Sequence, residues 1–161
     1  MIEIRRAGPD DAEAIARVHV RAHGETYPPL LAPQPYAAPD LALRSAQWRG
    51  ALGGPGAAFV ASDGGRVVGF GHLHDDTITT LYILASHHRR GIGRRLLARL
   101  LSELSTRGVA EARFDVLARN AGAIAFYEAE GARPIGRRTV EEADGTFEDI
   151  VYAIATDRRP A

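Results

Sequence analysis

The sequence contains no cysteine and no lysine, and these two absences exclude several kinds of chemistry. Without cysteine there can be no disulfide bond, no thiolate nucleophile and no acyl-thioester formed on the protein itself. All 20 basic residues are arginine, which excludes a Schiff-base lysine and the lysine of a P-loop. An enzyme of this composition must work with histidine, carboxylate, hydroxyl and backbone groups.

Long apolar runs and net charge are also missing. No stretch approaches the ~18–20 apolar residues that a membrane span requires, and residues 1–11 are too charged for a secretory signal. The 20 basic and 20 acidic residues cancel, so a general attraction to nucleic acid or to an anionic membrane is not expected. We therefore expect a cytoplasmic protein without nucleic-acid or membrane partners.

The length of 161 residues, with 45% apolar and 25% charged residues, is typical of one globular domain with a buried core. The hydrophobic periods and the glycine, proline and asparagine positions predict a mixed α/β sheet of about seven strands flanked by about four helices. The expected helices are residues 9–23, 40–52, 93–107 and 120–130, and the expected strands are 2–7, 57–61, 66–75, 77–85, 112–117, 132–141 and 146–155. A loop is expected over residues 28–39, which hold five of the nine prolines. Strands 77–85 and 112–117 should be parallel, since the connection between them is a helical crossover.

The most informative segment is residues 81–100, where an apolar stretch leads into a turn with Gly91 and Gly93 and then into an amphipathic helix. Such a unit presents unpaired backbone N–H groups at the positive end of a helix, and glycine lets a ligand approach the backbone. Arginine occupies positions 89, 90, 94, 95 and 99. A dinucleotide fingerprint would need glycine in place of Leu96, and a P-loop would need lysine. The segment therefore favours another phosphate-bearing ligand over a plain turn with solvated arginines.

Residues 81–97 resemble the acetyl-CoA loop of the GNAT acetyltransferases, whose pattern Gln/Arg-x-x-Gly-x-Gly/Ala reads here from His88 to Gly93. His88 departs from the pattern, because the family prefers Gln or Arg there. The resemblance implies that the backbone of Leu81, Tyr82 and Ile83 pairs with the pantetheine arm, in a slot that a strand bulge opens. It also implies that the pyrophosphate is held by Arg89, Arg90, Gly91, Ile92, Gly93 and Arg94.

The resemblance continues over residues 112–131, where Asn120 starts a helix and Tyr127 follows two turns later on the same side. In the family, this Asn hydrogen-bonds the pantetheine arm, and this Tyr commonly protonates the departing thiolate. The alternatives are a helix N-cap for Asn120 and a core aromatic residue for Tyr127. Both roles of Asn120 are compatible with each other.

The residue that takes the proton from the amine is less clearly marked. Asp115 lies where ribosomal-protein alanine acetyltransferases carry a catalytic acidic residue, and the alternative is a solvent-facing charge. His72, His74 and Asp76 alternate along one expected strand and should share one face. We interpret His72 as a candidate base or substrate contact, with a metal site or an exposed polar face as the other interpretations.

The first 56 residues resemble the acceptor side of family members, which makes Glu25 and Tyr27 candidate substrate contacts. Residues 1–161 are thus predicted to form one N-acetyltransferase domain, with an acceptor-side part (1–56), an acetyl-CoA-binding core (57–131) and C-terminal strands (132–161).

We expect direct transfer of an acetyl group from acetyl-CoA to a primary amine of a small molecule or protein N-terminus, without a metal. The alternative is a non-catalytic acyl-CoA-binding sensor or scaffold. RNA binding through the arginine cluster is disfavoured by the zero net charge. Dimers are common in the family, which makes a homodimer compatible with this interpretation.

Overall fold

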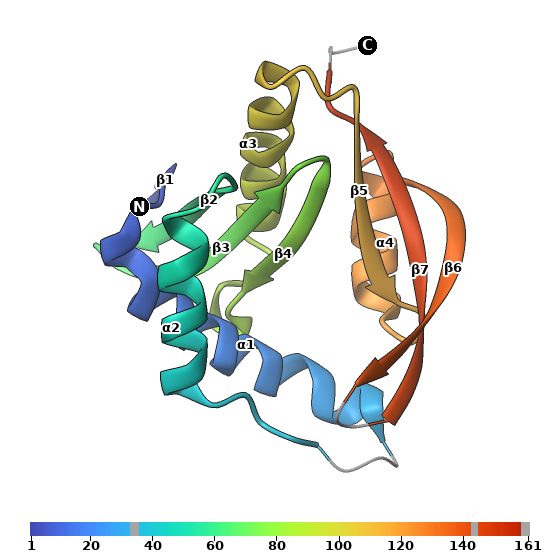
Figure 1. Cartoon of the computed structure of the whole chain (residues 1–161), viewed down its shortest axis with the longest axis horizontal. Helices are drawn as coiled ribbons and strands as arrows, with labels where there is room; N and C mark the ends of the chain where they lie inside the picture. The colour runs from blue at the N-terminus through green and yellow to red at the C-terminus, as the bar shows by residue number, and fades with distance from the viewer. Residues whose placement is uncertain (33–35, 143–144, 159–161) are drawn as a thin grey trace.

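The structure is a computed structural model that describes residues 1–32, 36–142 and 145–158. In this part of the chain, seven strands form one mixed sheet in the order β1-β2-β3-β4-β5-β7-β6, and four α-helices cover it (Figure 1). The predicted fold class is therefore confirmed. The strands are β1 (Ile2–Arg6), β2 (Ala57–Asp63), β3 (Arg66–His74), β4 (Thr77–Ile83), β5 (Glu111–Leu117), β6 (Arg133–Glu142) and β7 (Gly145–Ala155). The helices are α1 (Ala12–Leu31), α2 (Leu41–Leu52), α3 (Ile92–Thr106) and α4 (Ala121–Ala129).

Helix α3 is held against the first half of the sheet by a stripe of leucines. These leucines recur at helical spacing and are completely buried: Leu96, Leu97, Leu100, Leu101 and Leu104. The helix lies so close to β3 that a Cβ on Gly71 would be 2.6 Å from Leu100 Cδ1. Glycine at this position therefore permits the close approach. Phe70 points to the opposite face, where it contacts α1 and α2 through His19 and Trp48.

The centre of the sheet opens between β4 and β5. These two strands are parallel, as predicted, but among the described residues they keep strand register only at Thr77 and Arg113. A backbone hydrogen bond of 2.9 Å from Arg113 to Asp76 marks the same end of the pair. Beyond it the strands diverge, whereas β5 stays paired with β7 over its whole length (Figure 1). The divergence leaves the β5-facing edge of β4 without a strand partner towards Ile83.

Helix α1 ends eight residues later than predicted, at Leu31, and runs through Pro28 and Pro29. The sequence-based expectation of a loop beginning at Pro28 was therefore wrong. The two prolines sit in the final turns, where they remove only two helical N–H donors, and the helix still buries Leu31. Arg119, which follows β5, donates Nη1 to the carbonyls of Leu30 (3.3 Å) and Ala32 (3.0 Å) and so satisfies the end of the helix. The predicted loop residues 33–35 lie outside the described residues.

None of the described helices is both long enough and apolar enough to cross a membrane.

Candidate active site

The turn before α3 adopts the conformation that its glycines predict. Gly91 has φ 74° and ψ 9°, a left-handed conformation that suits glycine, and a Cβ there would meet no atom within 4 Å. Helix α3 begins at Ile92, and its first internal bond runs from Arg95 N to Gly91 O at 3.1 Å. The N–H groups of Ile92, Gly93 and Arg94 are thus left without a helical acceptor at the positive end of the dipole. This geometry fits an anionic ligand.

The five arginines around this turn do not act as one cluster. Arg95 reaches away to the carbonyl of Ile2 at 3.3 Å, and Arg99 lies over the ring of Phe59 at 4.9 Å. Two others are held at the turn: Arg90 by Asp63 (3.8 Å) and Arg94 by Glu130 (3.3 Å). Arg89, with φ 65°, has no ion pair among the described residues. Of the five arginines, only Arg89, Arg90 and Arg94 are therefore candidates to bind an anion at the turn.

Two histidines, His87 and His88, connect the turn to the sheet. His88 lies 2.9 Å from Ile83 O through Nε2, which must donate because the carbonyl can only accept. His87 contacts Asp63 on β2 at 3.0 Å, and this bond holds the pKa of the Asp63 carboxyl below its usual range. His88 thus connects the turn at Gly91 directly to the end of β4, although a histidine at this position departs from the family pattern.

Asn120 and Tyr127 begin and line helix α4. Asn120 Oδ1 accepts a hydrogen bond from Ala123 N at 3.1 Å, which confirms its interpretation as an N-cap. Tyr127 is half-buried and packs on Phe114, with ring centroids 4.4 Å apart. Its hydroxyl has no hydrogen-bond partner among the described residues. Burial, and the nearby Tyr27, raise the pKa of Tyr127 well above its ordinary value.

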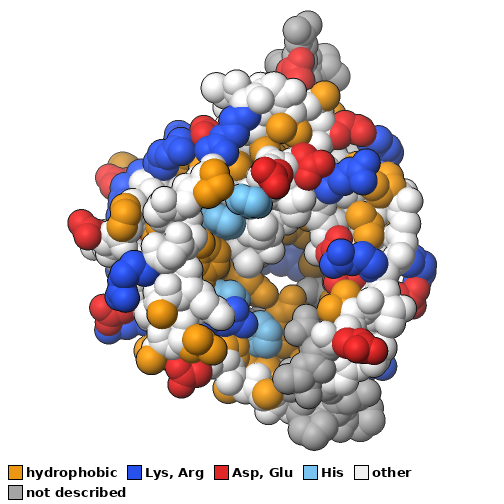
Figure 2. All heavy atoms as spheres, viewed as in Figure 1, with side chains coloured by type: hydrophobic (Ala, Val, Ile, Leu, Met, Phe, Trp, Pro, Cys, Tyr) orange, Lys and Arg blue, Asp and Glu red, His pale blue; other side chains and the backbone are white. Residues whose placement is uncertain are grey.

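A row of aromatic side chains on α1 faces β4. His19, His23 and Tyr27 recur every four residues, so they lie along one face of the helix. His19 stacks on Tyr82 with centroids 5.1 Å apart, and burial together with a hydrogen bond to Tyr27 raises the pKa of Tyr82. At the other end, Trp48 Nε1 donates to His19 Nδ1 at 3.0 Å. In Figure 2, histidine side chains border the hollow near the middle of the molecule.

Sequence reasoning missed His19, His23 and Trp48 as parts of this site. The spacing of His19, His23 and Tyr27 was a usable signal, but the predicted helix ended at residue 23, and Tyr27 was therefore taken as a loop residue. The structure brings together Tyr27 on α1, Tyr82 on β4 and Tyr127 on α4, which come from three separate parts of the chain.

Three other predicted site residues are engaged elsewhere. Glu25 accepts a hydrogen bond from Ala85 N at 3.1 Å, just beyond β4. Asp115 forms an ion pair with Arg138 at 2.6 Å, on the face of β5 opposite to α4. His72 is buried, with Nδ1 2.6 Å from Thr79 Oγ1 and its ring edge-on to Trp48. Burial lowers the pKa of His72.

The expected alternation of His72, His74 and Asp76 holds only for the first two, because β3 ends at His74 and Asp76 falls in the turn after it. His72 is buried and His74 is exposed. Beside His72 the β3–β4 register shifts, because Thr79 is an extra residue in β4. The described residues contain no group of three His, Cys, Asp or Glu side chains that could hold a metal ion.

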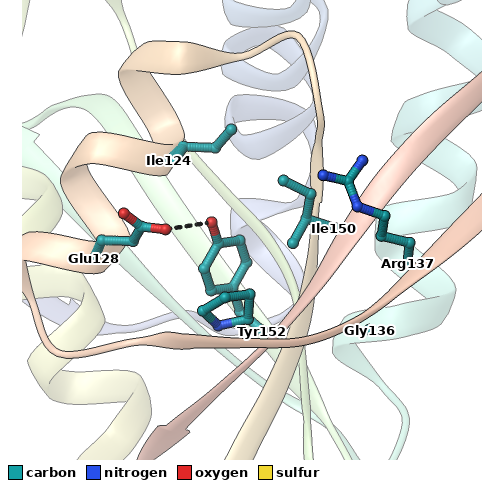
Figure 3. A pocket seen from close by; sticks show the side chains of 7 residues that line it. Ile124, Glu128, Gly136, Arg137, Ile150 and Tyr152 are labelled. Carbon is teal, nitrogen blue, oxygen red and sulfur yellow. Dashed lines mark hydrogen bonds between the residues drawn. The ribbon is translucent and has the colours of Figure 1, made fainter.

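A separate hollow lies away from these residues, between α4 and the β6–β7 pair (Figure 3). Its volume is about 660 Å³, and it is lined by Ile124, Glu128, Pro134, Gly136, Arg137, Ile150 and Tyr152. The Tyr152 hydroxyl donates to Glu128 Oε1 at 2.9 Å across one side of it. The hollow includes neither the turn at Gly91 nor Tyr127.

Comparison with known proteins agrees with this geometry. The family described as "Acetyltransferase (GNAT) family" matches residues 19–132. The chain belongs to this family. The opened β4 edge, the glycine turn at Gly91 and the Asn120 cap occur in that order along the chain.

GNAT relatives of known name share the central part of the chain. The [ribosomal protein bS18]-alanine N-acetyltransferase of Escherichia coli K12 is 37% identical over 84 residues, which are 51% of this chain and 57% of that protein. The match with the enzyme of Salmonella typhimurium is 38% identical over the same span. The chain thus matches only a little over half the length of these relatives.

GNAT structures match almost the whole chain. An N-acetyltransferase from Staphylococcus aureus Mu50 superposes with a TM-score of 0.78 at 22% identity, covering 98% of this chain and 99% of that one. The ribosomal-protein-S18-alanine N-acetyltransferase from Escherichia coli gives 0.73 at 25% identity, covering 99% and 97%. The yncA protein from Salmonella typhimurium, solved with its cofactor acetyl-CoA, gives 0.74 at 19% identity, covering 100% and 97%.

Proposed function

We propose that the protein transfers an acetyl group from acetyl-CoA directly to a primary amine of a small molecule or a protein N-terminus. One observation carries this proposal. The β4–β5 pair opens beyond Thr77 and Arg113, and the opening ends at the unpaired N–H groups and arginines before α3. A ligand with a strand-like amide arm and a pyrophosphate matches both parts of this slot. Acetyl-CoA has that shape and charge.

The residues of the slot have complementary tasks in this proposal. Leu81, Tyr82 and Ile83 offer backbone groups on the unpaired edge of β4 to the pantetheine arm, while the segment from Arg89 to Arg94 holds the pyrophosphate. Asn120 caps α4 and contacts the arm at the far wall. His88 fixes the end of β4 relative to the turn, which keeps the two halves of the slot at a constant distance.

The reaction forms a C–N bond and breaks the C–S bond of the thioester. The amine must lose a proton, and the departing CoA thiolate must gain one. Tyr127 is suited to supply the second proton, since its raised pKa keeps the phenol protonated at neutral pH. Asp115 is the candidate base that accepts the proton of the amine, because of its position in the family pattern. For this task, Arg138 must share or release the Asp115 carboxylate, with which it forms an ion pair.

The proposal is tested by incubating the protein with acetyl-CoA and a panel of primary amines and measuring the release of CoA thiol. We expect thiol release that depends on an amine, together with acetylated amine in equal amount. Tight binding of acetyl-CoA without turnover of any amine would instead favour the sensor or scaffold function. Location in the cytoplasm and a homodimer stay predictions of the sequence.

The order of events is tested by mass spectrometry of the protein after incubation with acetyl-CoA alone. Because the chain has no cysteine, we expect the protein mass to be unchanged. An acetylated protein that passes its acetyl group to an added amine would contradict direct transfer.

A further inference from the structure

Arg44 is a half-buried cation without a counter-ion at the start of α2. Its Nη1 donates to the side-chain Oε1 of Gln47 at 3.1 Å, and it forms no ion pair with any described residue. Asp40, one turn earlier, is occupied as the N-cap of α2, where Oδ1 accepts from Leu43 N at 2.7 Å. A half-buried guanidinium with a neutral partner retains most of its capacity to bind an anion.

The neighbours of Arg44 place it on the acceptor side of the slot. Arg44 and Trp48 are four residues apart on α2 and therefore share a face, and Trp48 is hydrogen-bonded to His19. The charge of Arg44 acts on both His19 and Tyr82, which belong to α1 and β4. The turn at Gly91, which would hold the CoA phosphates, lies instead at the start of α3, and α3 packs on the other face of the sheet. Arg44 is thus separate from the groups that would hold the CoA phosphates.

The described side chains that link Arg44 to β4, Trp48, His19 and Tyr82, are aromatic. His19 is buried and neutral at physiological pH, since burial and the charges of Arg44 and His23 lower its pKa to about 4. The ring of His23 packs on the rings of Tyr27 and Tyr36, with centroid distances of 4.3 Å and 5.6 Å. The acids nearest along α1 and β5 are already engaged, Glu25 with Ala85 N and Asp115 with Arg138. One positive charge in an aromatic wall is typical of a site that recognises a carboxylate beside an apolar group.

We propose that Arg44 binds a carboxylate of the acceptor, so that the acceptor is an amine which also carries a carboxylate, as in an amino acid or an acidic peptide. This inference rests on the proposed acetyl transfer and specifies its substrate class. The aromatic wall formed by Trp48, His19 and Tyr82 would receive the apolar part of the same molecule. The amine would then point along Tyr82 towards the opened edge of β4.

Binding is tested without any turnover, because Trp48 is the only tryptophan of the chain and lies one turn from Arg44. Its fluorescence is followed while leucine, methionine or phenylalanine is added, each as the free acid and as the primary amide. We expect the acid of at least one pair to bind more tightly than its amide. Arg44→Gln should weaken binding of the acid about 10- to 100-fold and leave the amide unchanged, since a charge-assisted bond is lost.

Catalysis is tested by the ratio of kcat/KM for acid and amide in the wild type and in three variants. An amino-acid amide has the lower ammonium pKa and supplies more free amine at neutral pH, so a preference for the acid must come from binding. Arg44→Gln should lower the acid-to-amide ratio about 10-fold or more, and Arg44→Lys should restore part of it. Arg49→Gln, on the exposed part of α2, is the matched control and should keep the wild-type ratio.

A second arm separates the two sources of the carboxylate. Peptide amides with Asp or Asn after the N-terminal residue replace the amino acids in this arm, and the ratio of kcat/KM for the Asp and Asn peptides is measured. In either arm, a ratio that depends on Arg44 supports the proposal, and the arm in which it appears identifies the source of the carboxylate. Equal ratios in wild type and Arg44→Gln in both arms, with equal Trp48 titrations, would overturn it. Loss of thiol release with every amine, while Trp48 still reports an Arg44-dependent carboxylate, would count against acetyl transfer and not against this site.

Discussion

At the scale of single residues, two tyrosines show how a similar environment leads to different chemistry. Tyr127 and Tyr152 both pack on Phe114, with centroids 4.4 and 5.7 Å away. The Tyr152 hydroxyl donates to Glu128, so its proton has a fixed partner. The Tyr127 hydroxyl has no such partner among the described residues, and its pKa is raised by burial and by Tyr27. Of the two, we therefore propose Tyr127 as the proton donor to a bound group.

Replacement of Tyr127 by Phe is expected to lower kcat by ~10²–10⁴-fold, the usual contribution of a general acid. The ring contacts with Phe114 persist in the variant, so the Kd of acetyl-CoA should change little. Pre-steady-state or steady-state thiol release measures kcat, and calorimetry measures the Kd. A loss of less than threefold in kcat would show that Tyr127 only packs in the slot.

The Tyr152→Phe variant is the matched control for this substitution. It removes a phenol from the same aromatic group, together with the hydrogen bond to Glu128. We expect a loss of about 1 kcal/mol in the free energy of unfolding and nearly unchanged kcat. A similar fall of kcat in both variants would indicate a general effect on α4 instead of proton donation.

At the scale of elements, the parts that depend on local sequence could be predicted, and the parts that depend on distant contacts could not. The leucine stripe and the glycines fixed the position of α3 within one residue, and Asn120 correctly marked the start of α4. The end of α1 was missed because Pro28 and Pro29 outweigh every local helix signal. The carbonyls of Leu30 and Ala32 at the end of this longer helix accept hydrogen bonds from Arg119, which is far away in the sequence.

The same distinction explains the errors on β3 and in the candidate site. Period-2 alternation cannot reveal that β3 ends at His74 and leaves Asp76 in the turn, because the end of a strand depends on its pairing with the neighbouring strands. The resemblance supplied Tyr127, Asp115 and the turn. It gave no indication of the His19, Trp48 and Arg44 cluster, which forms only when α1 and α2 pack on the same face of the sheet.

The turn that begins α3 gives a prediction at this scale. Gly91→Val should abolish the rise in Tm that acetyl-CoA causes, because isopropyl atoms would occupy the open space in front of the N–H groups. Differential scanning fluorimetry with acetyl-CoA measures this rise. NAD should give no comparable rise in the wild type, and equal stabilisation by NAD would contradict the acyl-CoA interpretation.

Gly108→Val separates ligand blocking from backbone strain. Gly108 follows the other end of α3, has φ 83°, and also has no atom within 4 Å of a built Cβ. Both variants should lose a similar 1–2 kcal/mol from the left-handed conformation, which is a rough estimate for a residue with a side chain. Only Gly91→Val should lose the response to acetyl-CoA. Loss of the response in both would show that strain alone disables the protein.

At the scale of the whole molecule, the opened sheet must be held together from outside. Among the described residues, the halves β1–β4 and β5–β7 are joined by strand pairing only near Thr77 and Arg113. Helix α1 runs along the first half and reaches Arg119 in the second (Figure 1). Its packing on the sheet centres on buried His19, which receives the Trp48 hydrogen bond and stacks on Tyr82. The protonation of His19 therefore bears on the stability of the whole fold.

The pKa of His19 predicts how this stability changes with pH. Burial lowers its pKa from 6.5 to about 4, so between these values the unfolded chain binds a proton that the native protein does not. The free energy of unfolding should be highest above pH 6.5 and fall as the pH approaches 4, by on the order of 3 kcal/mol from this residue. Buried His72 acts in the same direction. Thermal unfolding from pH 7.5 to 4 measures the fall, roughly 6–12 °C in Tm.

His19→Gln isolates the contribution of this one residue, because glutamine can still accept the Trp48 hydrogen bond but does not titrate. The variant should be less stable than the wild type at pH 7.5, since the stacking on Tyr82 is lost, yet its Tm should fall less between pH 6.5 and 4. His74→Gln removes an exposed histidine and should leave the wild-type slope. If His19→Gln and the wild type lose the same stability over this range, the pKa of His19 is not lowered in the native protein, and the aromatic wall beside Arg44 would gain a second positive charge below pH 6.5.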